Sequence, residues 1–390
     1  MPSWLALTAI ILAEGSRQDS IWAPYLALLP RELDSLVFWS AAELQELQAS
    51  TVVSKIGRSA AEDMFSQHIT PLQLENGSVE MCHRVASIIM AYAFDIPEKE
   101  SQEEADTAEG DDLVSDDGED EKTILAMIPL ADMLNADASR NNARLCCYDE
   151  NLEMRSIMPI SKGEEIFNDY GQLPQSDLLR RYGYTTNNYA VYDVAEVSTK
   201  SILAFLAKGQ LLSADNTLSP LSREQLDRRV ELAQREGVYE DSFDICHSGP
   251  DGPSIPDELL GLLFLLLVDE ENLAAIESSQ ASLSSRLKLA TVLVGKVLAV
   301  ILESRAKEYS TTIEEDRALL QAGNLTSRHI MAIQVRLGEK LVLEEAIQEA
   351  KSFTGSDKKM RLKHDSAPKT HSGKRKVEDD AAGRKKGRVR

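Results

Sequence analysis

An acidic stretch of low complexity, residues 97–122, most constrains how this chain can fold. It contains 13 acidic and two basic residues, with one valine and one leucine between the charges. A segment of this composition cannot bury enough apolar surface to become ordered. Strongly patterned sequence resumes on both sides of it, so we expect a disordered insertion within one folded domain.

The regions around the insertion differ in periodicity. Residues 1–96 predict mostly helices, among them a buried helix over residues 81–94. Short strands are predicted downstream at 124–129, 143–147, 152–157 and 165–168, followed by a helical turn over 176–182 that ends at Gly183. From about Ser201 the pattern is helical, with candidate helices at 201–209, 221–236, 256–268, 283–307, 312–322 and 325–351.

These patterns divide the chain into three parts. The first part, residues 1–198, combines the helices of residues 1–96, the acidic insertion and the short strands that follow it. The second is an all-α domain over residues 199–352. Residues 353–390 have no aromatic residue after Phe353 and predict a disordered basic tail.

The charge distribution indicates the kind of partner. The 390 residues carry a net charge of −22, whereas residues 357–390 contain 13 basic and five acidic residues. An acidic body repels nucleic acid and attracts basic proteins, and the tail lacks aromatic residues on which bases could stack. We therefore expect the protein to bind a basic protein and not to bind nucleic acid directly. We also expect it to be a monomer.

Membranes and metals are not expected partners. No segment approaches the roughly 20 consecutive apolar residues of a membrane-spanning helix. The four cysteines form no CxxC pair, so the ligands of a structural zinc site are missing. Reduced thiols in an intracellular compartment are the simplest interpretation.

The most informative stretch of the sequence is residues 129–184. It reads PLADMLNAD, then NARL, then MPISKGEEIFNDYG, and ends in LLRRYGY. Each part alone is common, because glycine turns and Tyr-Gly pairs occur in many proteins. The order and spacing of the parts are much rarer.

In this order the parts resemble SET-domain protein-lysine methyltransferases of the Rubisco large-subunit methyltransferase type, and within them the fungal ribosomal lysine methyltransferases. The segments WAPYLALLP, FWSAAELQEL and HRVASIIMAYAFD are similar to the helical insertion of that family, and residues 201–351 to its substrate-binding domain. The resemblance implies an α+β fold, with a β-rich SET domain over residues 1–198 that carries a helical insertion at 1–96, followed by an all-α substrate-binding domain over residues 199–352. It also implies S-adenosylmethionine as cofactor and a ribosomal protein of the large subunit as substrate, with monomethylation as the outcome.

The resemblance assigns roles to six residues. Tyr170 matches the catalytic tyrosine, whose hydroxyl can orient a neutral amine without adding charge. Asn135 and Ala136 match the cofactor-binding pair, although alanine replaces the commoner histidine and leaves only backbone contacts at that position. Tyr182 and Tyr92 match further cofactor-contacting positions. Asp132 matches a position on the substrate side.

Other interpretations of these residues are structural. Tyr182 and Tyr184 could be core aromatic residues, and Asp132 could be a helix cap or a turn residue. His83 and Arg84 lie on an apolar helix, and we expect them to be polar groups with hydrogen-bonding partners rather than ligands.

One element of the family is missing from the sequence. SET domains use a Gly-x-Gly strand pair to hold the methionine end of the cofactor, and no Gly-x-Gly occurs in this chain. An incomplete gene model, a truncated isoform, and a diverged protein that keeps only its binding surface are three explanations, of which we favour the first. The chain as written is expected to bind S-adenosylmethionine poorly, and tight cofactor binding in a calorimetric titration would contradict this expectation.

One alternative to a lysine methyltransferase remains open. The chain could be a truncated, non-catalytic SET-like protein that binds a basic partner through its helical domain. Under either function the tail could direct nuclear import, because residues 374–388 contain two clusters of basic residues. We expect a nuclear protein that is also present in the cytoplasm, and an unchanged distribution after deletion of residues 374–390 would contradict the nuclear-import signal.

Overall fold

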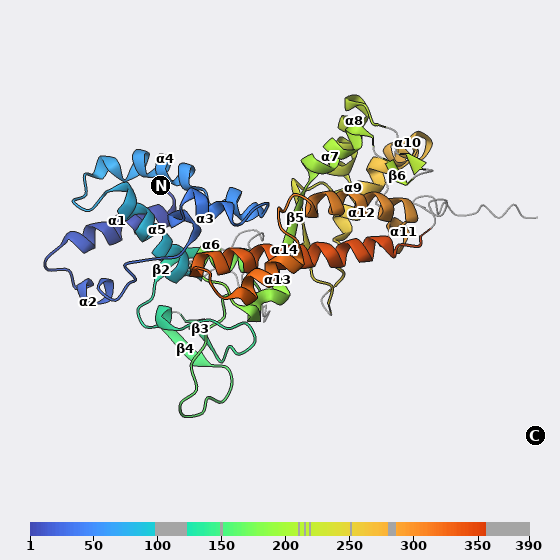
Figure 1. Cartoon of the computed structure of the whole chain (residues 1–390). Helices are drawn as coiled ribbons and strands as arrows, with labels where there is room; N and C mark the ends of the chain where they lie inside the picture. The colour runs from blue at the N-terminus through green and yellow to red at the C-terminus, as the bar shows by residue number, and fades with distance from the viewer. Residues whose placement is uncertain are drawn as a thin grey trace, which may run out of the picture.

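The computed structural model describes residues 1–97, 123–148, 151–209, 211–213, 216–217, 220–249, 252–279 and 286–355. Figure 1 shows a helical N-terminal region and a second group of helices, joined by the long helix α14 (Ser327–Lys351). Nearly all of the acidic insertion and of the basic tail lies outside the described residues. No helix among the described residues is both long and apolar enough to cross a bilayer.

The N-terminal region is helical, as its sequence predicts. Its main helix, α5, begins after Ser78, whose hydroxyl accepts a hydrogen bond from the Met81 amide. The apolar face of α5 packs with α1 and α4 around Leu5 and Phe65. The α-helices of this region are α1 (Ser3–Ser16), α2 (Ala23–Leu26), α3 (Ala41–Gln45), α4 (Arg58–His68) and α5 (Val79–Tyr92). Its 3₁₀ helices are η1 (Leu36–Phe38), η2 (Thr51–Lys55) and η3 (Thr70–Leu72).

Two antiparallel strand pairs follow these helices. Strand β1 (Ala93–Pro97) pairs with β2 (Thr123–Met127), so the two ends of the acidic insertion lie side by side. Strand β3 (Ala143–Cys147) pairs with β4 (Leu152–Ser156) in a hairpin that projects from the body of the molecule (Figure 1). The strand expected at 165–168 is instead a single bridge between Asn168 and Ala136.

The second half of the chain is built around one apolar core. Helices α9, α12 and α14 contribute fully buried residues such as Leu263, Leu298 and Leu343. The α-helices here are α6 (Gln175–Tyr182), α7 (Thr199–Lys208), α8 (Arg223–Arg235), α9 (Asp257–Leu267), α10 (Glu270–Ser279), α11 (Arg286–Leu289), α12 (Val292–Ala306), α13 (Ile313–Ala322) and α14. The remaining elements are η4 (Ala131–Met133), η5 (Asn187–Tyr192), β5 (Val194–Ser198), β6 (Leu211–Ser213), β7 (Asn216–Thr217) and β8 (Ser242–Cys246).

The expected α+β fold class is confirmed, with corrections inside the C-terminal region. Residues 201–351 are not entirely helical, because β8 pairs with β5 along one side of the core. The helix expected over 283–307 is interrupted at residues 290–291, where Thr291 caps the start of α12. His83 and Arg84 have protein partners, as expected, since His83 contacts Glu62 at 3.0 Å and Arg84 donates to the Pro30 carbonyl.

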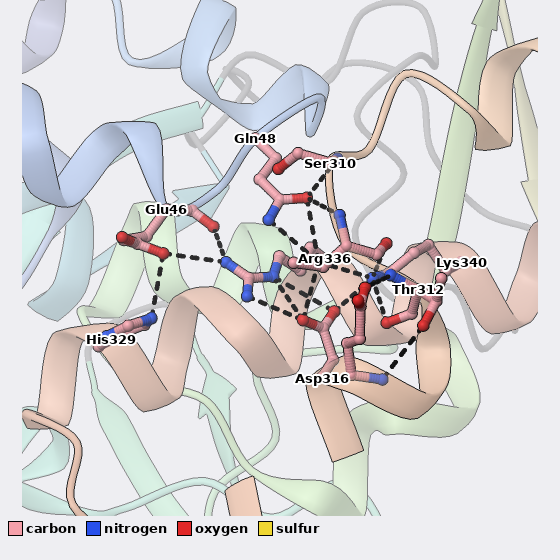
Figure 2. A network of polar contacts seen from close by, with 10 residues as sticks. Glu46, Gln48, Ser310, Thr312, Asp316, His329, Arg336 and Lys340 are labelled. Carbon is pink, nitrogen blue, oxygen red and sulfur yellow. Dashed lines mark hydrogen bonds and ion pairs between the residues drawn. The ribbon is translucent and has the colours of Figure 1, made fainter. Parts of the chain in front are cut away.

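A buried polar network connects the N-terminal region to the C-terminal helices (Figure 2). Arg336 of α14 donates to both carboxylate oxygens of Asp316 and to the carbonyl and carboxylate of Glu46. Lys340, one turn further along α14, also contacts Asp316. Asp316 is 0% exposed and Arg336 is 1% exposed. We call Glu46, Asp316, Arg336 and Lys340 the Asp316 network.

A second buried carboxylate lies at the same junction. The Glu339 side chain accepts hydrogen bonds from the hydroxyls of Ser50 (2.6 Å) and Tyr309 (2.5 Å). Burial raises its pKa from 4.5 to about 7. Because the folded chain holds this proton more tightly than the unfolded chain, the stability that Glu339 contributes is lost as the pH rises from about 4.5 to 7.

Glu339→Gln is therefore expected to flatten the pH dependence of stability. The amide resembles the protonated acid, so the variant should match the wild type near pH 4.5 and gain up to about 3 kcal/mol above pH 7. Urea unfolding of the wild type and the variant across this pH range measures the difference between their free energies of unfolding. If the two free energies changed with pH in parallel, the raised pKa of Glu339 would be contradicted.

Candidate active site

The six residues singled out in the sequence line one cavity. Its volume is about 520 Å³, and we call it the tyrosine cavity. The site residues in its wall are Tyr92, Asp132, Asn135, Ala136, Tyr170 and Tyr182. They come from the end of α5, from η4 and the segment after it, from the segment before α6, and from the last turn of α6. Their individual roles stay predictions.

Tyr170 and Tyr182 form the aromatic wall of the cavity. Their rings are stacked, with centroids 4.3 Å apart and planes 6° from parallel. The Tyr170 hydroxyl donates a hydrogen bond to the Leu134 carbonyl at 3.2 Å. Burial raises the pKa of Tyr170, and the neighbouring Tyr182 adds to the effect. The hydroxyl therefore stays neutral throughout the physiological pH range.

A glycine after α6 places a third tyrosine beside this pair. Gly183 ends the helix with φ of 76°, and a Cβ atom there would lie 2.8 Å from the Ser35 amide nitrogen. Only glycine combines this backbone conformation with such a close approach. The chain turns here and brings the ring of Tyr184 edge-on to Tyr182, at 6.4 Å between centroids.

The segments that carry the two motifs are joined by backbone hydrogen bonds. The Asn168 amide donates to the Asn135 carbonyl at 2.8 Å, and the Asp137 amide donates to the Asn168 carbonyl at 3.2 Å. The Asn135 side chain donates to Glu165 at 2.7 Å. These contacts hold the LNAD segment beside the FNDYG segment, which brings Asn135 and Ala136 to the same cavity as Tyr170.

Asp137 is a fixed negative charge in the wall. Arg140 donates to its carboxylate at 2.6 and 2.8 Å, and Asn188 donates at 3.0 Å. Burial alone would raise the pKa of Asp137, but the hydrogen bonds from Arg140, Ser139 and Asn188 outweigh it and lower the pKa to about 2. Asp137 thus stays ionised and ties its turn to η5.

The environment of Asp132 differs from that of Asp137. It is 5% exposed, and one of its oxygens, Oδ2, accepts a hydrogen bond from the Tyr25 hydroxyl. The other oxygen, Oδ1, is buried and has no hydrogen-bonding partner among the described residues. Burial raises the pKa of Asp132. The side chain does not cap a helix, so the structural interpretation of Asp132 as a cap is wrong.

Sequence reasoning missed several residues of the cavity wall. Asp137 and Arg140 lie in or next to the LNAD motif, and Phe167 lies in IFNDYG, so proximity to the motifs was a usable signal. Tyr184 was considered only as a core residue, yet it lines the cavity. Tyr189, from η5, has no sequence signal of this kind, because only the tertiary fold brings it to the cavity.

Comparison with known families agrees with this arrangement. The SET-domain profile matches residues 15–171, and the profile described as Rubisco LSMT substrate-binding matches residues 220–343. The chain is a SET-domain protein with a Rubisco LSMT-type substrate-binding domain. The resemblance drawn from the motifs is therefore confirmed.

Individual relatives support the same assignment. Ribosomal lysine N-methyltransferase 4 of Saccharomyces cerevisiae is 34% identical over 298 residues, which is 68% of this chain and 54% of that protein. The chain thus spans about half the length of this relative. N-lysine methyltransferase setd6 of Xenopus laevis is 26% identical over 384 residues, covering 90% of this chain and 79% of the relative.

A solved structure shows the same fold. The SET domain of LSMT bound to lysine and AdoHcy superposes with a TM-score of 0.63 at 22% sequence identity, covering 90% of this chain and 75% of that one. At this identity the likeness establishes the fold alone.

Proposed function

We propose that this protein transfers a methyl group from S-adenosylmethionine to the side-chain amine of a lysine in a basic protein. We further propose a large-subunit ribosomal protein as substrate and monomethyl-lysine as product. The observation that carries the proposal is the tyrosine cavity, where residues from both motifs meet around a neutral tyrosine hydroxyl. The names of the relatives and the net charge of −22, which favours a basic substrate, support it.

The residues of the cavity fit the expected cofactor. Tyr92, Tyr182, Asn135 and the backbone of Ala136 would hold it, because they offer aromatic faces, an amide and carbonyl oxygens. When bound, S-adenosylmethionine supplies a methyl group on a positively charged sulfur. Aromatic faces and oxygen acceptors favour such a cation in a water-poor site.

The chain's own groups then orient the acceptor amine. The Tyr170 hydroxyl donates a hydrogen bond to the Leu134 carbonyl, so its oxygen lone pairs remain able to accept a hydrogen bond from the lysine amine. Because Tyr170 is neutral, it does not favour the ammonium form, and the amine can lose its proton to water before transfer. Catalysis of this displacement then consists mainly of holding the nitrogen lone pair in line with the methyl group.

Labelled methyl transfer tests the proposal. The full chain is incubated with radiolabelled S-adenosylmethionine and salt-washed large ribosomal subunits, and the labelled protein is hydrolysed to amino acids. Because the sequence contains no Gly-x-Gly, the cofactor is supplied at millimolar concentration. We expect label in monomethyl-lysine of a basic protein and none in an acidic control protein.

The other outcomes of this assay are equally informative. Label in another amino acid would overturn the lysine assignment, and label in dimethyl- or trimethyl-lysine would overturn the proposed product. Stable binding of a basic ribosomal protein without any transfer would support the non-catalytic alternative instead.

A further inference from the structure

A hydrogen bond reaches Asp132 from outside the tyrosine cavity. Tyr25 lies in α2, and its hydroxyl donates to Oδ2 of Asp132 at 2.5 Å across 107 residues of sequence. Asp132 lines the cavity, whereas Tyr25 is not among the described residues that do. Tyr25 therefore acts on a bound molecule from behind the cavity wall, through Asp132 to which it is hydrogen-bonded.

The backbone around Asp132 forms a short, irregular turn. The η4 turn is only three residues long, and the hydrogen bonds from the Asp132 and Leu134 amides measure 3.2 and 3.3 Å. Leu130, just before the turn, has φ of 78°, a region that leucine disfavours, and its side chain is 80% exposed. The hydrogen bond from Tyr25 is the side-chain contact that holds the carboxylate from outside the turn, and backbone hydrogen bonds from Asp132 and Leu130 also favour its ionised form.

The ionised form of Asp132 is stabilised by hydrogen bonds rather than by a cation. Burial raises its pKa, and within the described part of the chain the groups that oppose this rise are the Tyr25 hydroxyl and backbone amides, with no Lys, Arg or His among them. Oδ1 is buried without a partner, while Tyr25 occupies Oδ2. A buried carboxylate with one unfilled oxygen is suited to a cation that donates hydrogen bonds, and an alkyl ammonium group meets that description.

We propose that Tyr25 is a positioning residue, which holds Asp132 by one oxygen so that the other receives the ammonium group of the substrate lysine. This inference rests on the proposed function, since it takes lysine as the acceptor. After the ammonium group has lost one proton, the neutral amine still has N–H groups and can donate a hydrogen bond to Asp132. The contact therefore persists when the amine becomes neutral beside Tyr170.

The variant Tyr25→Phe tests this role with L-lysine as the probe. Calorimetric titration of the full chain measures lysine binding at about pH 6 and about pH 9. We expect binding to weaken about tenfold or more near pH 6 and clearly less near pH 9. The reason is that loss of the hydroxyl raises the pKa of Asp132 further, so at the lower pH more of the carboxylate is neutral.

A matched control and a direct readout complete the test. Tyr239→Phe removes another tyrosine hydroxyl that donates to an aspartate, Asp241, but Tyr239 does not line the cavity, so lysine binding should be unchanged. Carbon NMR of the aspartate carboxyls should show the Asp132 titration midpoint moving to higher pH in Tyr25→Phe alone.

Each result decides the matter. Unchanged lysine binding in Tyr25→Phe, or an equal loss at both pH values, would overturn the positioning role. A wild-type chain that methylates lysine but whose lysine binding is insensitive to Tyr25 would overturn this inference and leave the proposed function intact. A wild-type chain that neither binds lysine nor transfers a methyl group would overturn both.

Discussion

Tyr170→Phe is expected to lower the rate of methyl transfer by about a hundredfold or more while leaving cofactor binding in place. The variant keeps the ring that stacks on Tyr182 at 4.3 Å, so the shape of the cavity is preserved. It loses the hydroxyl that donates to the Leu134 carbonyl and that would accept a hydrogen bond from the amine. Single-turnover transfer to the ribosomal substrate measures the rate, and titration with S-adenosylhomocysteine measures binding.

The control for this variant is Tyr148→Phe. Tyr148 is 46% exposed and packs against Arg155 near the β3–β4 hairpin, away from the cavity wall. The variant Tyr148→Phe should retain the wild-type rate of methyl transfer. Wild-type transfer by Tyr170→Phe would remove Tyr170 from the mechanism, whereas loss of cofactor binding would indicate a disturbed cavity rather than a lost catalytic contact.

Asp316→Asn is expected to destabilise the protein by about 3–5 kcal/mol. The substitution leaves the side chain nearly the same size but removes the charge that Arg336 and Lys340 share. Burial would raise the pKa of Asp316, yet the hydrogen bonds from these two residues outweigh it and lower the pKa. The carboxylate is therefore ionised; without it the buried Lys340 loses its ion-pair partner, and Arg336 keeps only its contact with the carboxylate of Glu46.

Asp257→Asn is the matched control on the surface. Asp257 pairs with Arg286 at 2.8 Å, but its side chain is 59% exposed, so its loss should cost no more than about 1 kcal/mol. Urea unfolding monitored by circular dichroism gives the loss in free energy of unfolding for each of the two variants. Equal losses for the two variants would mean that the Asp316 network contributes no more than a surface ion pair to the junction between the N-terminal region and α14.

Much of the local structure could be predicted because its causes lie within a few residues. Ser78 marks the start of α5 through a hydrogen bond to an amide three residues on, and Gly183 ends α6 because only glycine tolerates that turn. The hairpin of β3 and β4 could likewise be read from two apolar runs around a short turn. The motifs at residues 129–184 carried the six site residues for the same reason.

Errors arose where a partner far along the chain decides the structure. The pairing of β8 with β5 joins residues 52 positions apart at the Val194–Cys246 register pair, so the strand that completes β8 lies far outside its local sequence. A strand gains its backbone hydrogen bonds only from its neighbour, so its own residues specify it weakly.

The sequence by itself determined the fold class, the presence of most helices and the motif residues, since capping, periodicity and turn chemistry act over a few residues. Tertiary structure alone decided which carboxylates are buried, and with which partners. Tyr25 and Asp132 are 107 residues apart, and Glu46 and Arg336 are 290 apart. Hydrogen bonds of this kind form only when the chain has closed around them, because burial gives them their strength and geometry selects their partners.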